Sequence, residues 1–181
     1  CIRDSHNTME MSFINILKNL NYTVIKSHNI LKEAYPYDIF LNALSTEDIF
    51  LHNLKYTDKN LISMIKCKKL LNVRQGYSKC STALINNSAA ITSDIKIHDI
   101  LTYNGMDVLL VPPGHIELPG LNYGFIGGTC GIVEEGSIAF FGSLDNYLYG
   151  DMVLKFLIQQ GVKPIFLSEG DLIDRGTIFR I

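Results

Sequence analysis

Residues 134–143 read EEGSIAFFGS, and the pattern of this stretch, which occurs at two earlier places, indicates a fold built from repeats. A polar turn precedes a short apolar strand, and the strand ends at a small polar residue before a helical stretch. The earlier turns occupy residues 45–48 and 86–88, so that Glu47, Asn87 and Glu135 lie 40 and 48 residues apart. A period in this range is typical of one supersecondary unit copied along a chain.

Each copy predicts two strands, a helix and a third strand, in the order β-β-α-β. Runs rich in β-branched and aromatic residues, bounded by Asn, Ser and Gly, are typical of strands joined in hairpins. The first strands are expected at residues 38–42, 80–85 and 129–133, the second at 49–51, 89–91 and 138–141, and the third within 70–76, 108–114 and 165–170.

The predicted helices follow residues that can cap them. Asp58 and Asp94 stand where a side-chain oxygen accepts from the first free N–H groups of a helix. Apolar residues then recur at helical spacing, and Gly105 and Gly161 follow two of the helices as stops. The expected inward-facing residues are Leu61, Ile62 and Ile65; Ile97, Ile100 and Leu101; and Met152, Val153, Phe156 and Leu157.

The two ends of the chain carry parts of a further repeat. Residues 13–20 predict a helix and residues 22–25 the strand after it, whereas residues 172–181 predict a first strand without a helix. Pairing these parts would close the repeats into a ring and remove an exposed sheet edge. We therefore expect one domain, residues 1–181, with repeats at 1–28 joined by 171–181, at 36–76, at 80–114 and at 126–170.

Composition excludes several classes of function. The 181 residues are 47% hydrophobic, enough for a sizeable core, and the net charge of −2 argues against a nucleic-acid-binding surface. No apolar run reaches the roughly 20 residues that span a bilayer, and the sequence shows no secretory leader. The four cysteines have no zinc-site spacing. We expect a cytoplasmic protein without metal, cofactor, nucleic-acid or membrane partners.

Two stretches resemble a known family. Residues 124–133 followed by 138–142 are similar to the Glu-Gly-Gly-Asp strand and the next apolar strand of the penteins, the α/β-propeller fold of guanidine-modifying enzymes. Residues 72–81 and 113–120 more closely resemble an uncharacterised clostridial-type group of that fold. The resemblance implies an α/β-propeller of β-β-α-β repeats. Since penteins have five repeats, it also implies that one repeat precedes Cys1 or is absent.

The resemblance breaks at two positions that matter for activity. Ile126 and Thr129 stand where the enzymes carry the Glu and Asp that hold the substrate guanidinium. That interaction needs charge-assisted, often bidentate hydrogen bonds, which neither residue can make. We therefore expect no efficient arginine or agmatine deiminase activity.

The family's chemistry implies a Cys nucleophile, a His acid/base and acidic residues around a central axis. Cys80 and Cys130 are the candidate nucleophiles, and Asp38, Asp174 and Arg175 are candidate ligand-binding residues because they too stand where first strands begin. A thiolate is the reactive form of cysteine. The alternative for both cysteines is an ordinary buried thiol.

The other candidates come from sequence neighbours. Lys79 would favour a thiolate on Cys80, and His115 with Glu117 could form an acid/base pair or a hydrogen bond within a loop. Arg74 is a further candidate ligand-binding residue that is as readily structural.

Two functions remain open. One is an enzyme, or a degenerate one, acting on a small guanidino or amino-acid-like compound bound in a central cavity. The other is a non-catalytic interaction protein that kept the fold and lost the chemistry.

Overall fold

A computed structural model describes residues 11–180 of the chain. The described residues divide between Tyr77 and Ser78 into an N-terminal unit (11–77) and a C-terminal unit (78–180). Whether residues 1–181 form one domain therefore stays a prediction, and residues 1–10 and 181 of the predicted end repeat lie outside the described part. Within that part, no helix is long and apolar enough to cross a membrane.

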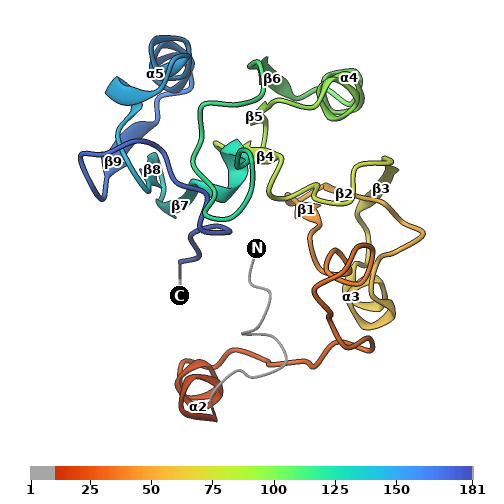
Figure 1. The fold of residues 1–181 in the computed structure, drawn as a ribbon. Coiled ribbons are helices and arrows are strands. Elements are labelled where there is room, and N and C mark those ends of the chain that lie inside the picture. Colours follow the sequence, from red (N-terminus) through yellow and green to blue (C-terminus); the bar gives the residue numbers. More distant parts are fainter. Residues whose placement is uncertain (1–10, 181) are drawn as a thin grey trace. The chain divides into compact units, whose positions relative to one another are not determined.

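The N-terminal unit contains one complete repeat. Helix α2 (Met11–Asn19) precedes the repeat. The repeat itself comprises β1 (Leu44–Ser45), β2 (Ile49–His52), α3 (Lys59–Met64) and β3 (Lys69–Asn72) (Figure 1). The strands form a sheet in the order β1-β2-β3, with β1 antiparallel and β3 parallel to β2. This is the predicted β-β-α-β order.

The C-terminal unit contains two more repeats of the same topology. The first is β4 (Thr82–Leu84), β5 (Ala89–Thr92), α4 (Ile95–Tyr103) and β6 (Asp107–Leu110). The second begins after the 3-10 turn η1 (Ile126–Gly128) and comprises β7 (Cys130–Glu134), β8 (Ser137–Phe140), the turn η2 (Leu144–Asn146), α5 (Gly150–Gln159) and β9 (Lys163–Phe166). Both sheets have the antiparallel-then-parallel pairing of the first. The chain is thus of mixed α+β class, and its predicted period is confirmed.

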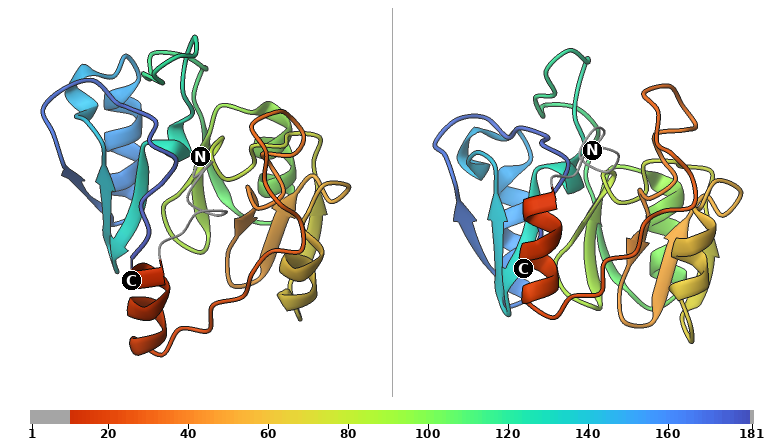
Figure 2. Two further views of the ribbon diagram at one scale, coloured as in Figure 1. Left: turned by 60° about the horizontal axis from the view of Figure 1, so that its bottom comes forward. Right: turned by 90° about the horizontal axis from the view of Figure 1, so that it is seen from below.

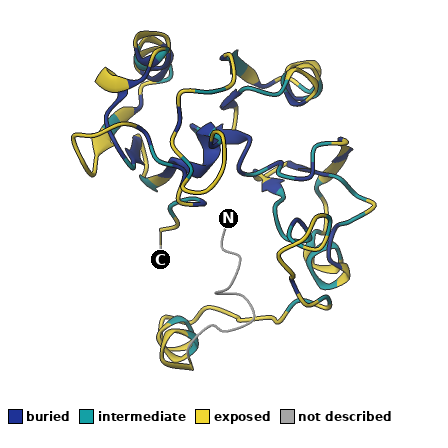
Figure 3. Cartoon of the chain, viewed as in Figure 1, coloured by how far each residue is buried: buried dark blue, intermediate teal, exposed yellow. Residues whose placement is uncertain are grey.

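The middle strand of each sheet forms the buried part of its repeat. All residues of β2, β5 and β8 are buried, whereas β3 and β9 are largely exposed and β6 is mostly half-buried (Figure 3). A strand paired on both sides and covered by a helix loses its contact with water, which explains why these strands are apolar rather than alternating. Each fully buried Leu, Ile or Phe stabilises the fold by about 1.5–3 kcal/mol.

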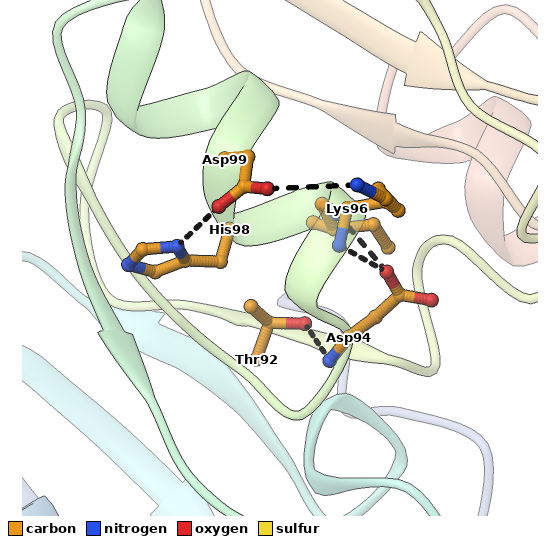
Figure 4. A network of polar contacts seen from close by, with 6 residues as sticks. Thr92, Asp94, Lys96, His98 and Asp99 are labelled. Atoms are coloured by element: carbon orange, nitrogen blue, oxygen red, sulfur yellow. Dashed lines mark hydrogen bonds and ion pairs between the residues drawn. The ribbon is translucent and has the colours of Figure 1, made fainter.

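Both predicted aspartate caps are confirmed. The Asp58 side chain accepts from the N–H groups of Asn60 and Leu61, and the Asp94 side chain accepts from those of Lys96 and Ile97. Figure 4 shows the second cap in its surroundings.

Around α4, the polar contacts continue on both sides of the cap. The Thr92 hydroxyl accepts from the N–H of Asp94, while Asp99 lies 3.1 Å from His98 Nδ1 and 3.9 Å from Lys96 Nζ (Figure 4). The ion pair is exposed, so it contributes little to stability. The network orders the start of a surface helix.

One apolar core serves both repeats of the C-terminal unit. It includes Ile91 of β5, Phe140 of β8 and Leu157 of α5, all fully buried. Figure 2 shows α5 alongside the sheet that contains β9. Of the predicted inward faces, Ile97, Leu101, Val153, Phe156 and Leu157 are buried, whereas Met152 is exposed.

The first predicted strand is misplaced. Residues 38–42 form turns, closed by hydrogen bonds from Ile39 N to Pro36 O and from Asn42 N to Ile39 O. The strand that pairs with β2 is the two-residue β1, several positions later. The turn hydrogen bonds use backbone groups that a ladder would need.

The strands predicted near the two chain ends, at residues 22–25 and 172–181, are not part of any sheet in the described structure. Residues 22–25 have no strand partner in the described structure. Residues 172–180 form only an isolated bridge, between Ile173 and Glu117. Ile178 N and the Thr177 hydroxyl nevertheless donate to Cys130 O at 3.5 and 3.1 Å, so this segment runs beside the start of β7.

Candidate functional site

Several predicted site residues of the C-terminal unit lie near the glycine pair Gly127-Gly128, whereas His115 lies elsewhere. A side chain at Gly127 would collide with the carbonyls of Lys79 and Thr82, and one at Gly128 would collide with the carboxylate of Asp174. Glycine is required here because backbone and carboxylate approach so closely. We call Lys79, Cys80, Cys130 and Asp174, with these glycines, the glycine-pair cluster.

Asp174 holds this cluster together through the main chain. Its side chain is 4% exposed, and its oxygens accept from the N–H groups of Phe125 and Gly176, each at 2.9 Å. A buried carboxylate is stable when it is hydrogen-bonded in this way. Asp174 therefore links the turn before η1 to the C-terminal segment.

Lys79 of the cluster and the neighbouring Arg175 have different environments. Lys79 Nζ donates to Gly127 O at 3.2 Å. Arg175 is exposed, with its guanidinium 5.6 Å from the centre of the Phe141 ring, while its backbone N–H donates to Gly128 O. Lys79 is thus directed at the glycine pair, and Arg175 is directed at an aromatic ring.

Both candidate nucleophiles are buried, each 1% exposed. The Cys80 thiol lies 3.8 Å from Gly176 O, and the Cys130 thiol 3.5 Å from Ile126 O. Burial raises the pKa of the Cys130 thiol to about 11, and the nearby positive charge of Lys79 opposes this only in part. Cys130 is therefore a neutral thiol in this structure, and the nucleophilic role of either cysteine stays a prediction.

The cysteines are not at equivalent strand positions. In the β7–β8 ladder Cys130 pairs with Phe140, and in the β4–β5 ladder of the preceding repeat the corresponding pair is Thr82 with Thr92. Thr82 is therefore the equivalent of Cys130, and Cys80 lies two residues before it. They nevertheless belong to one cluster, because the C-terminal segment contacts both: Gly176 O meets Cys80, and Thr177 meets Cys130 O.

Asp38 and Arg74 belong to the N-terminal unit. Asp38 Oδ2 accepts from the Tyr77 hydroxyl at 2.5 Å. Arg74 is exposed, and its carbonyl accepts from the Asn53 side chain at 3.1 Å. Whether Asp38 shares a cavity with the two cysteines stays a prediction.

His115 and Glu117 line a hollow of about 490 Å³, which we call the His115 hollow. Two backbone hydrogen bonds fix Glu117, because its N–H donates to Leu172 O and its carbonyl accepts from Asp174 N–H, each at 2.8 Å. The His115 ring packs edge-on to Tyr149 at 5.9 Å. The other lining residues are Ile116, Leu118, Pro119, Leu121, Asn122, Asn146 and Asp171. Sequence reasoning missed Asp171 and both asparagines, which have no shared spacing with His115.

A second hollow, of about 540 Å³, lies at the ends of β8 and β9 and shares Asn146 with the first. Asn146 Nδ2 donates to Glu169 O at 2.7 Å. The remaining lining residues are Ser143, Asp145, Phe166, Leu167, Ser168 and Glu169. Among residues 11–180, no Lys or Arg lines either hollow, so their described lining favours positively charged or neutral groups over anions.

His52 is a buried titratable residue of the N-terminal unit that no sequence pattern indicated. Its Nδ1 lies 2.8 Å from the Thr57 hydroxyl and its Nε2 lies 3.2 Å from Gly76 O. Burial lowers the pKa of His52 to about 4, although hydrogen bonds to the backbone of Gly76 and Ile39 act in the opposite direction. The carbonyl contact assigns the proton of the neutral ring to Nε2.

No group of three or more His, Cys, Asp or Glu side chains is placed to hold a metal ion within residues 11–180.

Comparison with known proteins shows a family but no characterised relative. The model of a family of unknown function, DUF6873, matches residues 5–179, so the chain belongs to that family. No curated protein and no solved structure matches the chain.

Proposed function

We propose that this member of DUF6873 is a pentein-like protein that binds a small guanidino or amino-acid-like ligand without modifying it. The His115 hollow would receive the cationic end of that ligand. The observation that carries the proposal is that two carboxylate residues, Glu117 and Asp171, line one hollow with His115, and that no Lys or Arg of the described residues lines it.

Electrostatics supports a cationic ligand. In the described part of the chain, neither Glu117 nor Asp171 takes part in an ion pair with a Lys or Arg. A guanidinium donates several hydrogen bonds in a fixed plane and pairs well with carboxylates. Asn122 and Asn146 add amide groups that can both donate and accept, which suits the carboxylate and amine of an amino acid.

Binding without chemistry is supported by the state of the candidate catalytic groups. No cysteine of the part that the structure describes lines the His115 hollow, and the Cys130 thiol is held neutral by burial. Ile126 and Thr129 are both buried, and the Thr129 hydroxyl donates to Ile126 O at 2.7 Å. These two positions therefore serve packing and offer no negative charge to a guanidinium.

The repeats support the pentein part of the proposal. Three sheets share one strand order and one pattern of antiparallel and parallel pairing. We propose that these repeats are blades of an α/β-propeller, with the residues at both chain ends contributing to a further blade. A crystal structure with the blades in one open sheet would overturn this part.

Ligand titration tests the proposed function. L-arginine, agmatine and lysine would be titrated by calorimetry into the full chain, into Glu117→Gln and Asp171→Asn, and into the matched control Glu135→Gln, whose carboxylate lies on an exposed turn. We expect saturable binding that each hollow variant weakens about tenfold or more and the control leaves unchanged. Binding unaffected by both variants would refute the site. Citrulline or ammonia release from arginine would refute the absence of chemistry.

A second function, that of an interaction protein, has one specific observation in its favour. Helix α2 has no buried residue; Phe13 and Ile16 on the helix are exposed, as is Leu20 directly after it. Exposed apolar residues on one helix are typical of a contact surface. Pull-down of one stoichiometric partner by the full chain, lost on Phe13→Ser with Ile16→Ser, would favour this function.

A further inference from the structure

The second hollow of the C-terminal unit adjoins the His115 hollow and has no role in the proposed function. Its volume is about 540 Å³, and it lies beyond the carboxyl ends of the parallel strands β8 and β9, so we call it the β9 hollow. Asn146 lines both hollows, which therefore meet at this residue. In open α/β sheets, ligands bind in crevices outside the carboxyl ends of parallel strands. Two adjoining hollows of this size can hold one elongated ligand.

Each hollow contributes two carboxylates. Asp145 and Glu169 line the β9 hollow, as Glu117 and Asp171 line the His115 hollow. Within residues 11–180, none of these four carboxylates forms an ion pair with a Lys or Arg, and no Lys or Arg lines either hollow. Hydrogen bonds from a cation to a carboxylate are stronger than those between neutral groups. A ligand that spans both hollows should therefore carry a positive charge at each end.

Asn146 determines what suits the middle of such a ligand. Its Nδ2 donates to Glu169 O at 2.7 Å, and this bond fixes which end of the amide is the donor. The other end, Oδ1, is an acceptor that takes no hydrogen bond from the described chain. A methylene group placed here would displace water from Oδ1 without replacing its hydrogen bond, whereas an N–H group would replace it. The middle of the ligand should therefore be an N–H donor.

The β9 hollow also has apolar lining and a buried hydroxyl. Phe166 and Leu167 are 40% and 54% exposed, so their side chains can cover the methylene groups between charged nitrogens. Ser143 is only 7% exposed. Its hydroxyl oxygen accepts from the N–H of Asp145 at 3.2 Å and keeps a second lone pair for a donor in the hollow. The hollow thus offers partners to both parts of an aliphatic amine.

We propose that the two hollows together bind a linear polyamine, with one primary ammonium group in each hollow and an internal secondary ammonium group at Asn146. The inference rests on the proposed function, because one cationic end of the ligand occupies the His115 hollow. It adds the class of ligand, since a compound with a single cationic end would leave Asp145 and Glu169 without a counter-charge.

Calorimetry on the full chain at constant ionic strength compares a triamine with its carbon analogue. Spermidine is the triamine, and 1,8-diaminooctane has the same chain length with a methylene in place of the internal nitrogen. We expect spermidine to bind about tenfold more tightly or better, and Asn146→Ala to reduce this preference to about threefold or less. Equal binding of the two amines by wild type would overturn the inference. So would a preference that Asn146→Ala leaves intact.

Variants of the two hollows separate this inference from the proposed function. Asp145→Asn combined with Glu169→Gln should weaken spermidine about tenfold or more and change L-arginine binding by less than about twofold. Glu117→Gln should weaken both ligands, and the control Glu135→Gln, on an exposed turn, should weaken neither.

The outcomes of these titrations differ for the two proposals. If spermidine ignores the double variant while L-arginine still requires Glu117, the polyamine site is refuted and the proposed function stands. If spermidine requires Asp145 and Glu169 but not Glu117, a ligand that spans both hollows is refuted. If neither ligand depends on Glu117, both proposals fail.

Discussion

Replacement of His52 by glutamine should remove an acid sensitivity of the N-terminal unit. His52 is fully buried, and its burial lowers the pKa of the ring from 6.5 to about 4. Glutamine keeps a donor for Gly76 O and an acceptor for the Thr57 hydroxyl, but it does not titrate. The variant therefore separates protonation from hydrogen bonding.

The sign of the effect follows from where the proton binds. Because the folded-state pKa lies below the unfolded one, the unfolded chain takes up the proton first as the pH falls. The free energy of unfolding is unaffected by His52 above pH 6.5 and decreases between pH 6.5 and pH 4. The shift in pKa corresponds to a loss of about 2 kcal/mol at pH 5 and about 3 kcal/mol below pH 4.

Hydrogen exchange of the β2 amides at pH 7.5 and pH 5, corrected for intrinsic rates, measures this loss in the unit that contains His52. Wild type should lose about 2 kcal/mol more than His52→Gln over this interval. The control His28→Gln, at an exposed position, should behave as wild type. An acid loss of the same size in His52→Gln and wild type would show that the ring is not held neutral.

Two further predictions concern buried side chains. Asp58 is buried and accepts hydrogen bonds from four backbone N–H groups, those of His28, Asn29, Asn60 and Leu61. Burial opposes ionisation of Asp58, but these hydrogen bonds outweigh the effect of burial and lower the pKa of the carboxyl group. Asp58→Ala should cost about 2–3 kcal/mol in urea unfolding at pH 7. The difference from wild type should become smaller as the pH falls through the lowered pKa of Asp58. A cost below about 0.5 kcal/mol at pH 7, on the order of an exposed cap, would contradict this prediction. Iodoacetamide at pH 8 should modify the exposed Cys67 and spare the buried Cys130, whose pKa is about 11. Peptide mass spectrometry measures the extent of modification at each cysteine. Comparable modification of both cysteines would show that Cys130 is accessible as a thiolate.

Local patterns in the sequence were sufficient for the repeats and their helices. A strand of apolar residues, a capping aspartate and a terminating glycine act over a few neighbouring residues, so Asp58, Asp94 and the period of β2, β5 and β8 could be predicted. The same local reasoning misplaced β1, because residues 38–42 have strand composition but their backbone closes turns.

The chemistry of the candidate sites was decided by contacts between residues distant in sequence. Asp174 meets Gly128 across the C-terminal unit, and Asp171 joins His115 in one hollow. The protonation states of His52 and Cys130 depend on desolvation by burial, which no neighbour in sequence reveals. The repeating unit could be predicted from the amino-acid sequence, because strand periodicity and helix capping are local. Which side chains are charged, buried or able to meet a ligand depends on the packing of segments far apart in the chain, and therefore became visible only in the folded protein.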